Sequence, residues 1–202
     1  MVIGFHVILT AYGFWLPNDP RGSWSDFVGV WELVRFGRAT TTDERRSLAR
    51  KPHDHRTRLA AKDALKYPAV RFAGQQARAI GRGFAAFVKR SGLKVWACSI
   101  LPEHTHLVVG RHRYSVEQIA SLLKGAATGR LNAEGIHPLR GFAAPKGKPP
   151  KAWAQGLWKV FLRTPADVRR AVRYVADNPA KEGLPPQRWS FVTLFGAHNS
   201  QG

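Results

Sequence analysis

The spacing of apolar positions changes several times along the chain, and each change marks an expected element. Residues 3–12 are rich in Ile, Val, Leu and Tyr, which predicts a β-strand. Between residues 69 and 90 the apolar side chains recur at intervals of three and four, which predicts an amphipathic helix that Ser91 and Gly92 should end. The apolar stripe of this helix consists of Ala73, Ala77, Ile80, Phe84, Phe87 and Val88.

The second half of the chain continues the pattern before a last helix. We expect strands over 93–101, 104–110 and 157–163, and a helix over 115–132 for which Ser115 is a suitable N-cap. With the first strand and helix, these elements follow the order strand, helix, strand, strand, helix, strand. This order predicts an α+β fold with a ferredoxin-like antiparallel sheet, to which the last helix is a C-terminal addition.

The last helix, over residues 164–177, has a well-defined start. Thr164 is a suitable N-cap, Pro165 suits the first helical position, and Asp167 stands at the capping-box position. Pro179 disfavours helical geometry at the residue before it, so we expect this helix to end near Asn178.

Composition adds an expected partner to this fold. The chain has 202 residues, with 32 Lys and Arg against 13 Asp and Glu, and its net charge is +19. Such a surface attracts polyanions, of which nucleic acid is the commonest; the alternative is a merely soluble basic protein. The length predicts a single domain over residues 1–202, with a basic insertion at 25–66 and a flexible loop at 135–155.

Other classes of protein are disfavoured. Cys98 is the only cysteine, so neither a disulfide framework nor a cysteine-based zinc site is expected. The first residues carry no basic leader and no cleavage signal, and no apolar run is long enough to cross a bilayer. We therefore expect a cytoplasmic protein without a membrane partner.

Two histidines stand one residue apart in the stretch LPEHTHLVVG. Alternate side chains of a strand share a face, so His104 and His106 should point to one side and Thr105 to the other. Two imidazoles on one face of a rigid strand would provide half of a metal site; the alternative is that they are ordinary packed residues. His53 and His55 have the same spacing in a polar, basic stretch, and we interpret them as surface residues.

The last helix presents a second candidate group. Tyr174 lies off its expected buried stripe, and Asn178 follows four residues later on the same edge. A phenol is a latent nucleophile, and a carboxamide oxygen is a hard ligand suited to Mg²⁺ or Mn²⁺. The alternative is an ordinary boundary tyrosine and an ordinary residue at the helix end. The expected buried stripe consists of Val168, Ala171, Val172 and Val175.

These stretches together resemble a known family. LPEHTHLVV is similar to the histidine–hydrophobic–histidine signature of single-tyrosine transposases of the HUH superfamily. RYVADNPAKEGL resembles the tyrosine-helix signature of the branch associated with repetitive extragenic palindromes (REP). FHVILTAYGFWLPNDPRGSW resembles the opening strand and loop of longer members. The resemblance covers most of the chain outside 25–66 and 135–155.

The resemblance implies a role for each candidate residue. His104 and His106 would be metal ligands and Asn178 the third protein ligand, with Mg²⁺ or Mn²⁺ as the cofactor. Tyr174 would attack a phosphodiester of single-stranded DNA with hairpin structure, which leaves a 5′-phosphotyrosine link and a free 3′-hydroxyl. The resemblance leaves open whether the protein acts as a monomer or as a homodimer.

Two features depart from the family pattern. The middle residue of the histidine motif is usually bulky and apolar; here it is Thr105, whose β-branched side chain still suits a strand. The basic insertion after Trp24 is longer than a minimal member needs. His6, on the first strand, can face either the site or the core.

Charge and aromatic content suggest where DNA binds. The expected contacts are Arg21, Trp24, Lys146 and Lys148, because cations follow phosphates and exposed aromatic rings stack on unpaired bases. The tryptophans that could either stack on bases or cover the edge of the core are Trp15, Trp24, Trp31 and Trp153.

Two other functions remain open. A replication-initiation or relaxase-type nickase would use the same chemistry, but relaxases usually carry the tyrosine before the histidine pair, and here it follows. A non-catalytic ferredoxin-like module would bind nucleic acid without cleaving it. A two-metal mechanism is disfavoured, because the 13 acidic residues are scattered through the chain.

Overall fold

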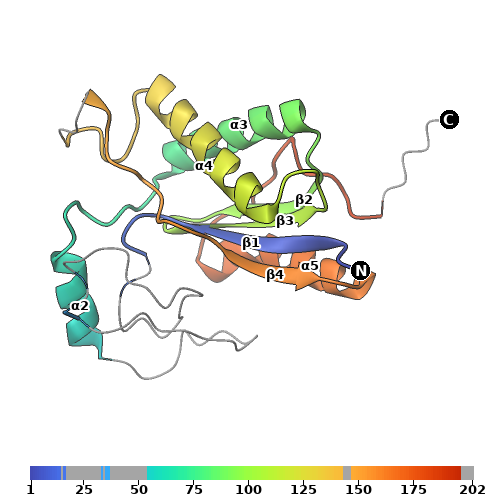
Figure 1. Ribbon diagram of the computed structural model, residues 1–202, viewed down its shortest axis with the longest axis horizontal. Coiled ribbons are helices and arrows are strands. Elements are labelled where there is room, and N and C mark those ends of the chain that lie inside the picture. Colours follow the sequence, from blue (N-terminus) through green and yellow to red (C-terminus); the bar gives the residue numbers. More distant parts are fainter. Residues whose placement is uncertain (15, 17–32, 34, 37–53, 143–146, 197–202) are drawn as a thin grey trace.

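The computed structural model describes residues 1–14, 16, 33, 35–36, 54–142 and 147–196. Helices cover both faces of a four-stranded sheet in this part of the chain, so the elements form three layers (Figure 1). The elements are β1 (Gly4–Thr10), α2 (His55–Asp63), α3 (Gly74–Ser91), β2 (Val95–Ile100), β3 (His104–Gly110), α4 (Val116–Ala133), β4 (Trp158–Leu162) and α5 (Pro165–Lys181).

The sheet has the order β2-β3-β1-β4, and every neighbouring pair is antiparallel. The chain places α3 between β1 and β2 and α4 between β3 and β4, which is the ferredoxin-like arrangement. The α+β fold class and the additional C-terminal helix predicted from the sequence are therefore confirmed. The central pair, β1 and β3, is the part of the sheet that carries the histidines.

Each face of the sheet has its own apolar core. α3 and α4 cover one face, where Val7, Leu107 and Phe84 are fully buried. α5 covers the other face, and Val108 of β3 packs there with Val175 of α5. The alternation of β3 follows directly, since its odd-numbered side chains face α3 and α4 while its even-numbered side chains face α5.

α4 and α5 begin at the N-caps that the sequence predicts. The Ser115 hydroxyl accepts a hydrogen bond from the Gln118 N–H, and the Thr164 hydroxyl accepts one from the Asp167 N–H at 3.1 Å. The Asp167 carboxylate accepts in return from the Thr164 N–H at 3.0 Å, which closes the capping box. These bonds fix the start of the helix that carries Tyr174.

The predicted end of α5 is wrong. The helix continues through Pro179 to Lys181, beyond the expected end at Asn178. Pro179 stands so near the end that the helix loses only the one hydrogen bond its missing N–H would make. Gly183, at a φ of 68°, then turns the chain away from the helix axis.

Two other elements differ from expectation. The helix expected from residue 69 begins at Gly74, with Ala73 as its N-cap in extended geometry. No helix or strand was predicted within the basic insertion at 25–66, but α2 lies there, and the Asp54 side chain caps it by accepting from the Thr57 N–H at 3.0 Å. The apolar pattern of this helix is weak, and Ala61, its one buried residue in the described part, packs with Leu16 and Leu33.

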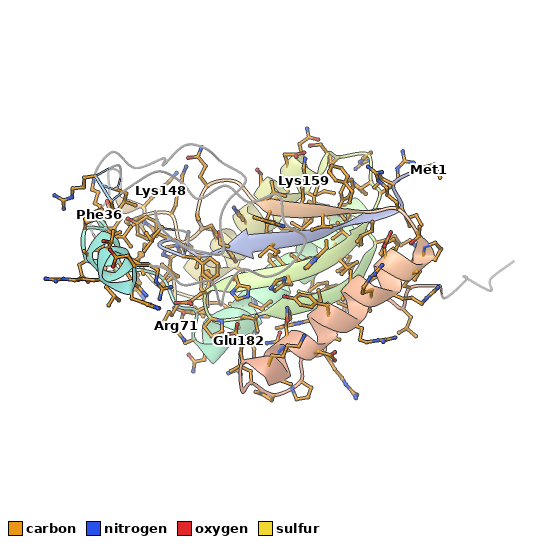
Figure 2. The ribbon with its side chains drawn as sticks, turned by 90° about the horizontal axis from the view of Figure 1, so that it is seen from below. Met1, Phe36, Arg71, Lys148, Lys159 and Glu182 are labelled. Carbon is orange, nitrogen blue, oxygen red and sulfur yellow. The ribbon has the colours of Figure 1, made fainter. Side chains whose placement is uncertain are left out.

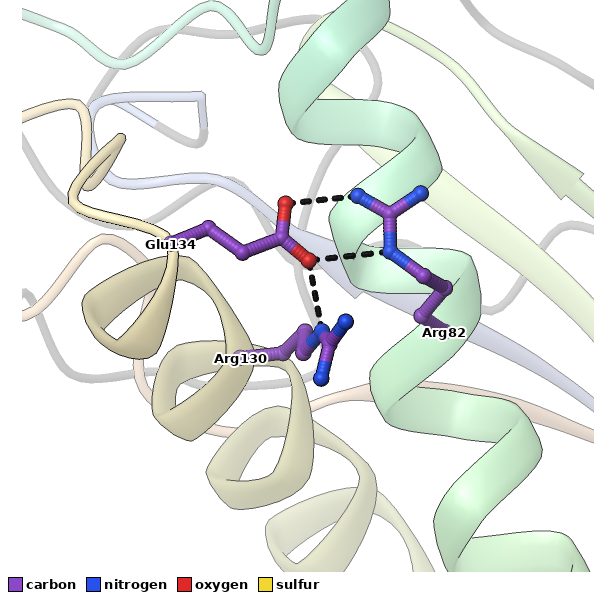
Figure 3. Close-up of polar contacts among 3 residues, drawn as sticks. All are labelled: Arg82, Arg130 and Glu134. Atoms are coloured by element: carbon purple, nitrogen blue, oxygen red, sulfur yellow. Dashed lines mark hydrogen bonds and ion pairs between the residues drawn. The ribbon is translucent and has the colours of Figure 1, made fainter.

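α3 and α4 pack closely and are joined by charged side chains at the surface. The Arg82 guanidinium donates to both carboxylate oxygens of Glu134, at 2.9 and 2.6 Å, and Arg130 shares one of these oxygens (Figure 3). The hydrogen bonds from Arg82 hold the pKa of Glu134 below its usual range. These contacts support the helix pair on the side of the sheet opposite α5.

Gly83 sets the distance between α3 and α4. A Cβ atom at this position would lie 2.7 Å from the Ala126 carbonyl oxygen and 2.9 Å from the Ala127 Cα. Because both atoms belong to backbone, we expect Gly83→Ala to lower the free energy of unfolding by about 1–3 kcal/mol. Gly125→Ala is the control, since a Cβ there meets nothing within 4 Å and should raise stability by up to about 1 kcal/mol. Urea unfolding measures both, and equal effects would contradict close packing at Gly83.

Lys124 of α4 anchors the segment that leads into β4. Its ammonium group donates to the Ala154 carbonyl at 2.7 Å and also to the Gly156 carbonyl. Burial lowers the pKa of Lys124 from 10.5 to about 8. The charged form is therefore less favourable in the folded chain than in the unfolded chain.

Stability should consequently rise with pH in the alkaline range. Between pH 8 and 10.5 the unfolded chain keeps a proton on Lys124 that the folded chain has lost, so raising the pH favours folding. This gain in the free energy of unfolding is complete above pH 10.5 and is lost as the pH falls through 8. Allowing for the partial exposure of Lys124, the gain amounts to about 2 kcal/mol. Urea unfolding of the wild type and Lys124→Met at both ends of this window measures it. A stability difference between the two proteins that is independent of pH would contradict the prediction.

Within the described residues, no helix combines the length and apolar character that crossing a bilayer requires.

Candidate active site

The two histidines of β3 share the face of the sheet that α5 covers. His104 lies opposite Thr10 and His106 opposite Ile8 in the pairing of β3 with β1. Their ring centroids are 4.8 Å apart, and His106 is 4% exposed. Thr105 is fully buried toward α3 and α4. The strand thus places both imidazoles on one side, as the alternation in the sequence predicts.

His6 of β1 completes a row of imidazoles. Its Nε2 lies 2.9 Å from Nδ1 of His106, and the two rings stack with centroids 5.2 Å apart. The sequence left the orientation of His6 open, and the structure places it on the α5 face against His106. The pairing of the strands explains this, because Ile8 stands opposite His106 and His6 is therefore its diagonal neighbour on the same face.

Tyr174 of α5 lies over these rings. Its ring centroid is 5.7 Å from that of His6 and 5.7 Å from that of His106. The ammonium of Lys181 lies 4.6 Å from the centroid of the tyrosine ring. The side chain of Tyr174 is 44% exposed, so the phenol stands beside the imidazoles and is still open to a large substrate.

Asn178 lies between two contacts that α5 makes with the histidines. Tyr174 meets His106 one helical turn before it, and the Glu182 carboxylate, four residues after it, lies 3.9 Å from Nε2 of His104. Asn178 is 6% exposed, and its amide nitrogen has no hydrogen-bond partner among the described residues. Figure 2 views the molecule from the α5 side and shows Glu182 at the end of that helix.

Burial favours the neutral form of the imidazoles of His6 and His106. Burial holds the pKa of His106 well below its usual range, and the neighbouring His6, His104 and Lys181 lower it further. Burial also lowers the pKa of His6 to about 4. Neutral rings have lone pairs at pH 7, which is the state in which histidine binds metals.

The kinds of donor atom around His104 and His106 determine which metal ions the site could bind. No three His, Cys, Asp or Glu side chains of the described part converge as a ready-made metal site. The imidazole pair therefore requires a ligand of another type, and Asn178 offers a buried carboxamide whose nitrogen has no hydrogen-bond partner among the described residues. A 180° turn of this amide would exchange its nitrogen for an oxygen ligand. Imidazole nitrogens suit transition-metal ions and a carboxamide oxygen suits Mn²⁺ and Mg²⁺, so this mixed donor set fits a divalent ion.

The DNA contacts expected from composition are partly outside the described residues. Arg21, Trp24 and Lys146 fall there, as do Trp15 and Trp31. Lys148 is exposed, and Figure 2 shows it at a distance from Glu182 and the end of α5. Of the two roles left open for Trp153, the structure supports the one in the core, since the residue is 6% exposed and its ring packs against Phe72.

Some residues of the site were not anticipated from the sequence. Glu182 and Lys181 approach the rings of His104 and Tyr174, and Phe14 lies with its centroid 5.0 Å from that of His104. The four-residue spacing from Tyr174 through Asn178 to Glu182 is a signal in the sequence. This signal alone does not identify Glu182 as a site residue, because its approach to His104 depends on how α5 packs on the sheet.

Comparisons with known proteins concern the whole chain. No protein-family model and no curated protein matches it. It is similar to a solved REP-associated tyrosine transposase bound to a REP hairpin, with 13% identity, a TM-score of 0.47 and coverage of 92% of this chain and 72% of that one. It is also similar to a candidate transposase from Deinococcus radiodurans R1, with 13% identity, a TM-score of 0.38 and coverage of 88% and 91%.

Proposed function

We propose that the protein is a metal-dependent single-tyrosine transposase that nicks and rejoins single-stranded DNA with hairpin structure. The observation that carries this proposal is the meeting of Tyr174 with His106 on one face of the sheet, with Asn178 one helical turn away. A nucleophile and donors for one cation are thus held by two rigid elements, β3 and α5. All of these residues belong to one chain in this structure.

Tyr174 would form a transient covalent bond to the DNA. Its phenol oxygen attacks the scissile phosphorus and releases its proton, while the bond from phosphorus to the 3′ oxygen breaks. The 3′ oxygen takes up a proton and leaves as a free hydroxyl, and the 5′ phosphate stays on the tyrosine. The new ester conserves the energy of the broken bond. A 3′-hydroxyl can therefore attack it and rejoin the strand without ATP.

His104, His106 and Asn178 would hold the Mg²⁺ or Mn²⁺ ion. When bound, such an ion supplies a Lewis acid that polarises a phosphate oxygen and neutralises developing charge. A free phenol has a pKa near 10 and is a weak nucleophile at neutral pH, which is why a polarised phosphate matters here. Fixed positions of Tyr174 and His106 would restrict the attack to a phosphate that lies between them.

The charge of the protein supports a polyanionic substrate. The net charge is +19, and α5 exposes Arg169 and Arg173 on turns close to Tyr174. These side chains, with Lys148 and the cations outside the described residues, would contact DNA phosphates. Affinity should then fall steeply with rising salt concentration.

End-labelled DNA tests this function. The wild type is incubated with Mn²⁺ and single-stranded hairpin DNA, and the products are separated under denaturing conditions. A 5′-phosphotyrosine predicts that a label at the 3′ end stays with the protein, whereas a label at the 5′ end is released on a fragment with a 3′-hydroxyl. Binding without any adduct on a panel of hairpins would favour the non-catalytic module. Adducts on unstructured strands but not on hairpins would favour a replication- or relaxase-type nickase.

A further inference from the structure

His6 is a half-buried imidazole to which the proposed chemistry assigns no role. It lies on β1, whereas the proposed ligands lie on β3 and α5. Its Nε2 is 2.9 Å from Nδ1 of His106, which is hydrogen-bond distance for two ring nitrogens. No group of three His, Cys, Asp or Glu side chains among the described residues is arranged around a common ion position. His6 therefore acts on His106 itself more readily than as a third imidazole ligand.

This contact has two possible arrangements, which differ in their consequence for His106. A neutral imidazole carries one N–H, and its other nitrogen has a free lone pair. If His106 accepts at Nδ1, its proton lies on Nε2 and that nitrogen cannot bind a cation. If His106 donates from Nδ1, its Nε2 keeps the lone pair. Because Nδ1 of His106 is occupied by His6 in either arrangement, the second alone leaves a nitrogen of His106 for a metal.

We propose that His6 is a positioning residue of the metal site, which accepts a hydrogen bond from Nδ1–H of His106 and so holds the tautomer whose Nε2 binds the ion. The inference rests on the proposed function for the identity of the metal ligands. Ligating histidines in proteins depend on such a partner at the second ring nitrogen, which fixes the tautomer and the ring orientation. The stacking of the two rings, with planes 30° apart, restricts rotation of His106 further.

Two substitutions of His6 separate positioning from packing. Gln at position 6 can place a carboxamide oxygen near the original Nε2 and accept the same hydrogen bond. Leu fills much of the same volume but accepts nothing. The matched control is His112→Leu, because His112 is also a half-buried imidazole with a ring nitrogen bonded, 3.0 Å from the Ser91 carbonyl, but it lies outside the site.

The first measurement uses the metal-free protein. NMR of ¹⁵N-labelled histidine rings identifies which nitrogen carries the proton, and the signals of His106 are assigned by their loss in His106→Ala. We expect the Nδ1–H tautomer to dominate for His106 in the wild type and in His6→Gln, and the tautomers to mix in His6→Leu. A wild-type His106 with its proton on Nε2 would overturn the proposal.

The second measurement is the affinity for Mn²⁺ without DNA, from the electron paramagnetic resonance signal of the free ion. The dissociation constant should rise about 10- to 100-fold in His6→Leu, as for loss of an outer-shell partner, and stay within about threefold in His6→Gln and His112→Leu. Equal affinities in the wild type and His6→Leu, or equal losses in His6→Leu and His6→Gln, would overturn the positioning role. The outcome is distinguishable from failure of the proposed function, which would show as Mn²⁺ binding without any Tyr174 adduct.

Discussion

Tyr174→Phe should abolish the covalent protein–DNA adduct and leave DNA binding nearly unchanged. The substitution removes the phenol oxygen that would attack the phosphorus but retains the ring that contacts His6 and His106. Loss of a covalent nucleophile lowers the rate of reaction by more than about 10³-fold. The measurement is the amount of 3′-labelled hairpin DNA that stays with the protein under denaturing conditions, compared with the affinity of each protein for the same hairpin in a gel-shift assay.

Tyr114→Phe provides the matched control for this experiment. Tyr114 is a partly buried tyrosine that lies beneath the Arg113 guanidinium and contacts His112, outside the candidate site. Its hydroxyl should be dispensable, so adduct formation in Tyr114→Phe should equal that of the wild type. If Tyr174→Phe still forms the adduct at the wild-type level, another side chain is the nucleophile and the proposed role of Tyr174 is wrong.

His106→Ala should remove Mn²⁺ binding. The imidazole is 4% exposed and contacts the rings of His104, His6 and Tyr174. Because a direct ligand is lost, we expect the dissociation constant for Mn²⁺ to rise by at least about 100-fold, above the range for an outer-shell partner. Titration of Mn²⁺ in the absence of DNA measures this effect independently of catalysis.

A second His-x-His pair in the chain provides a control for the His106 substitution. His55 belongs to the second His-x-His pair and lies exposed in the first turn of α2, whereas His53 is outside the described residues. His55→Ala should bind Mn²⁺ as the wild type does. Circular dichroism and urea unfolding confirm that His106→Ala is folded. Mn²⁺ affinity in folded His106→Ala equal to that of the wild type would exclude the histidine pair as the metal site.

The periodicity of the sequence predicted the layers of the fold because each element has one clearly apolar side. The strand alternation around His104 and His106 and the stripe of Val168, Ala171 and Val175 on α5 were sufficient to place these groups on facing surfaces. Local signals also located the helix starts, since capping at Ser115 and Thr164 depends on residues within one turn.

Features that depend on pairing between distant segments could not be predicted in this way. The contact of His6 with His106 follows from the register of β1 against β3, which no local pattern specifies. The end of α5 was misjudged because the general effect of Pro179 on the residue before it was given more weight than the packing of α5 on the sheet. α2 was missed because its pattern is weakly amphipathic and lies within a polar stretch.

The uninterrupted course of α5 from Pro165 to Lys181 has a consequence for how such chains can diverge. Tyr174 and Asn178 share one edge because they are four residues apart and each residue of a helix turns it by about 100°, and Glu182 follows as the C-cap. Inserting or deleting one residue between Tyr174 and Asn178 would swing one of them off the sheet, even if every side chain were kept. Evolution can therefore exchange the amide or the carboxylate for another polar group more easily than it can alter the length of this segment.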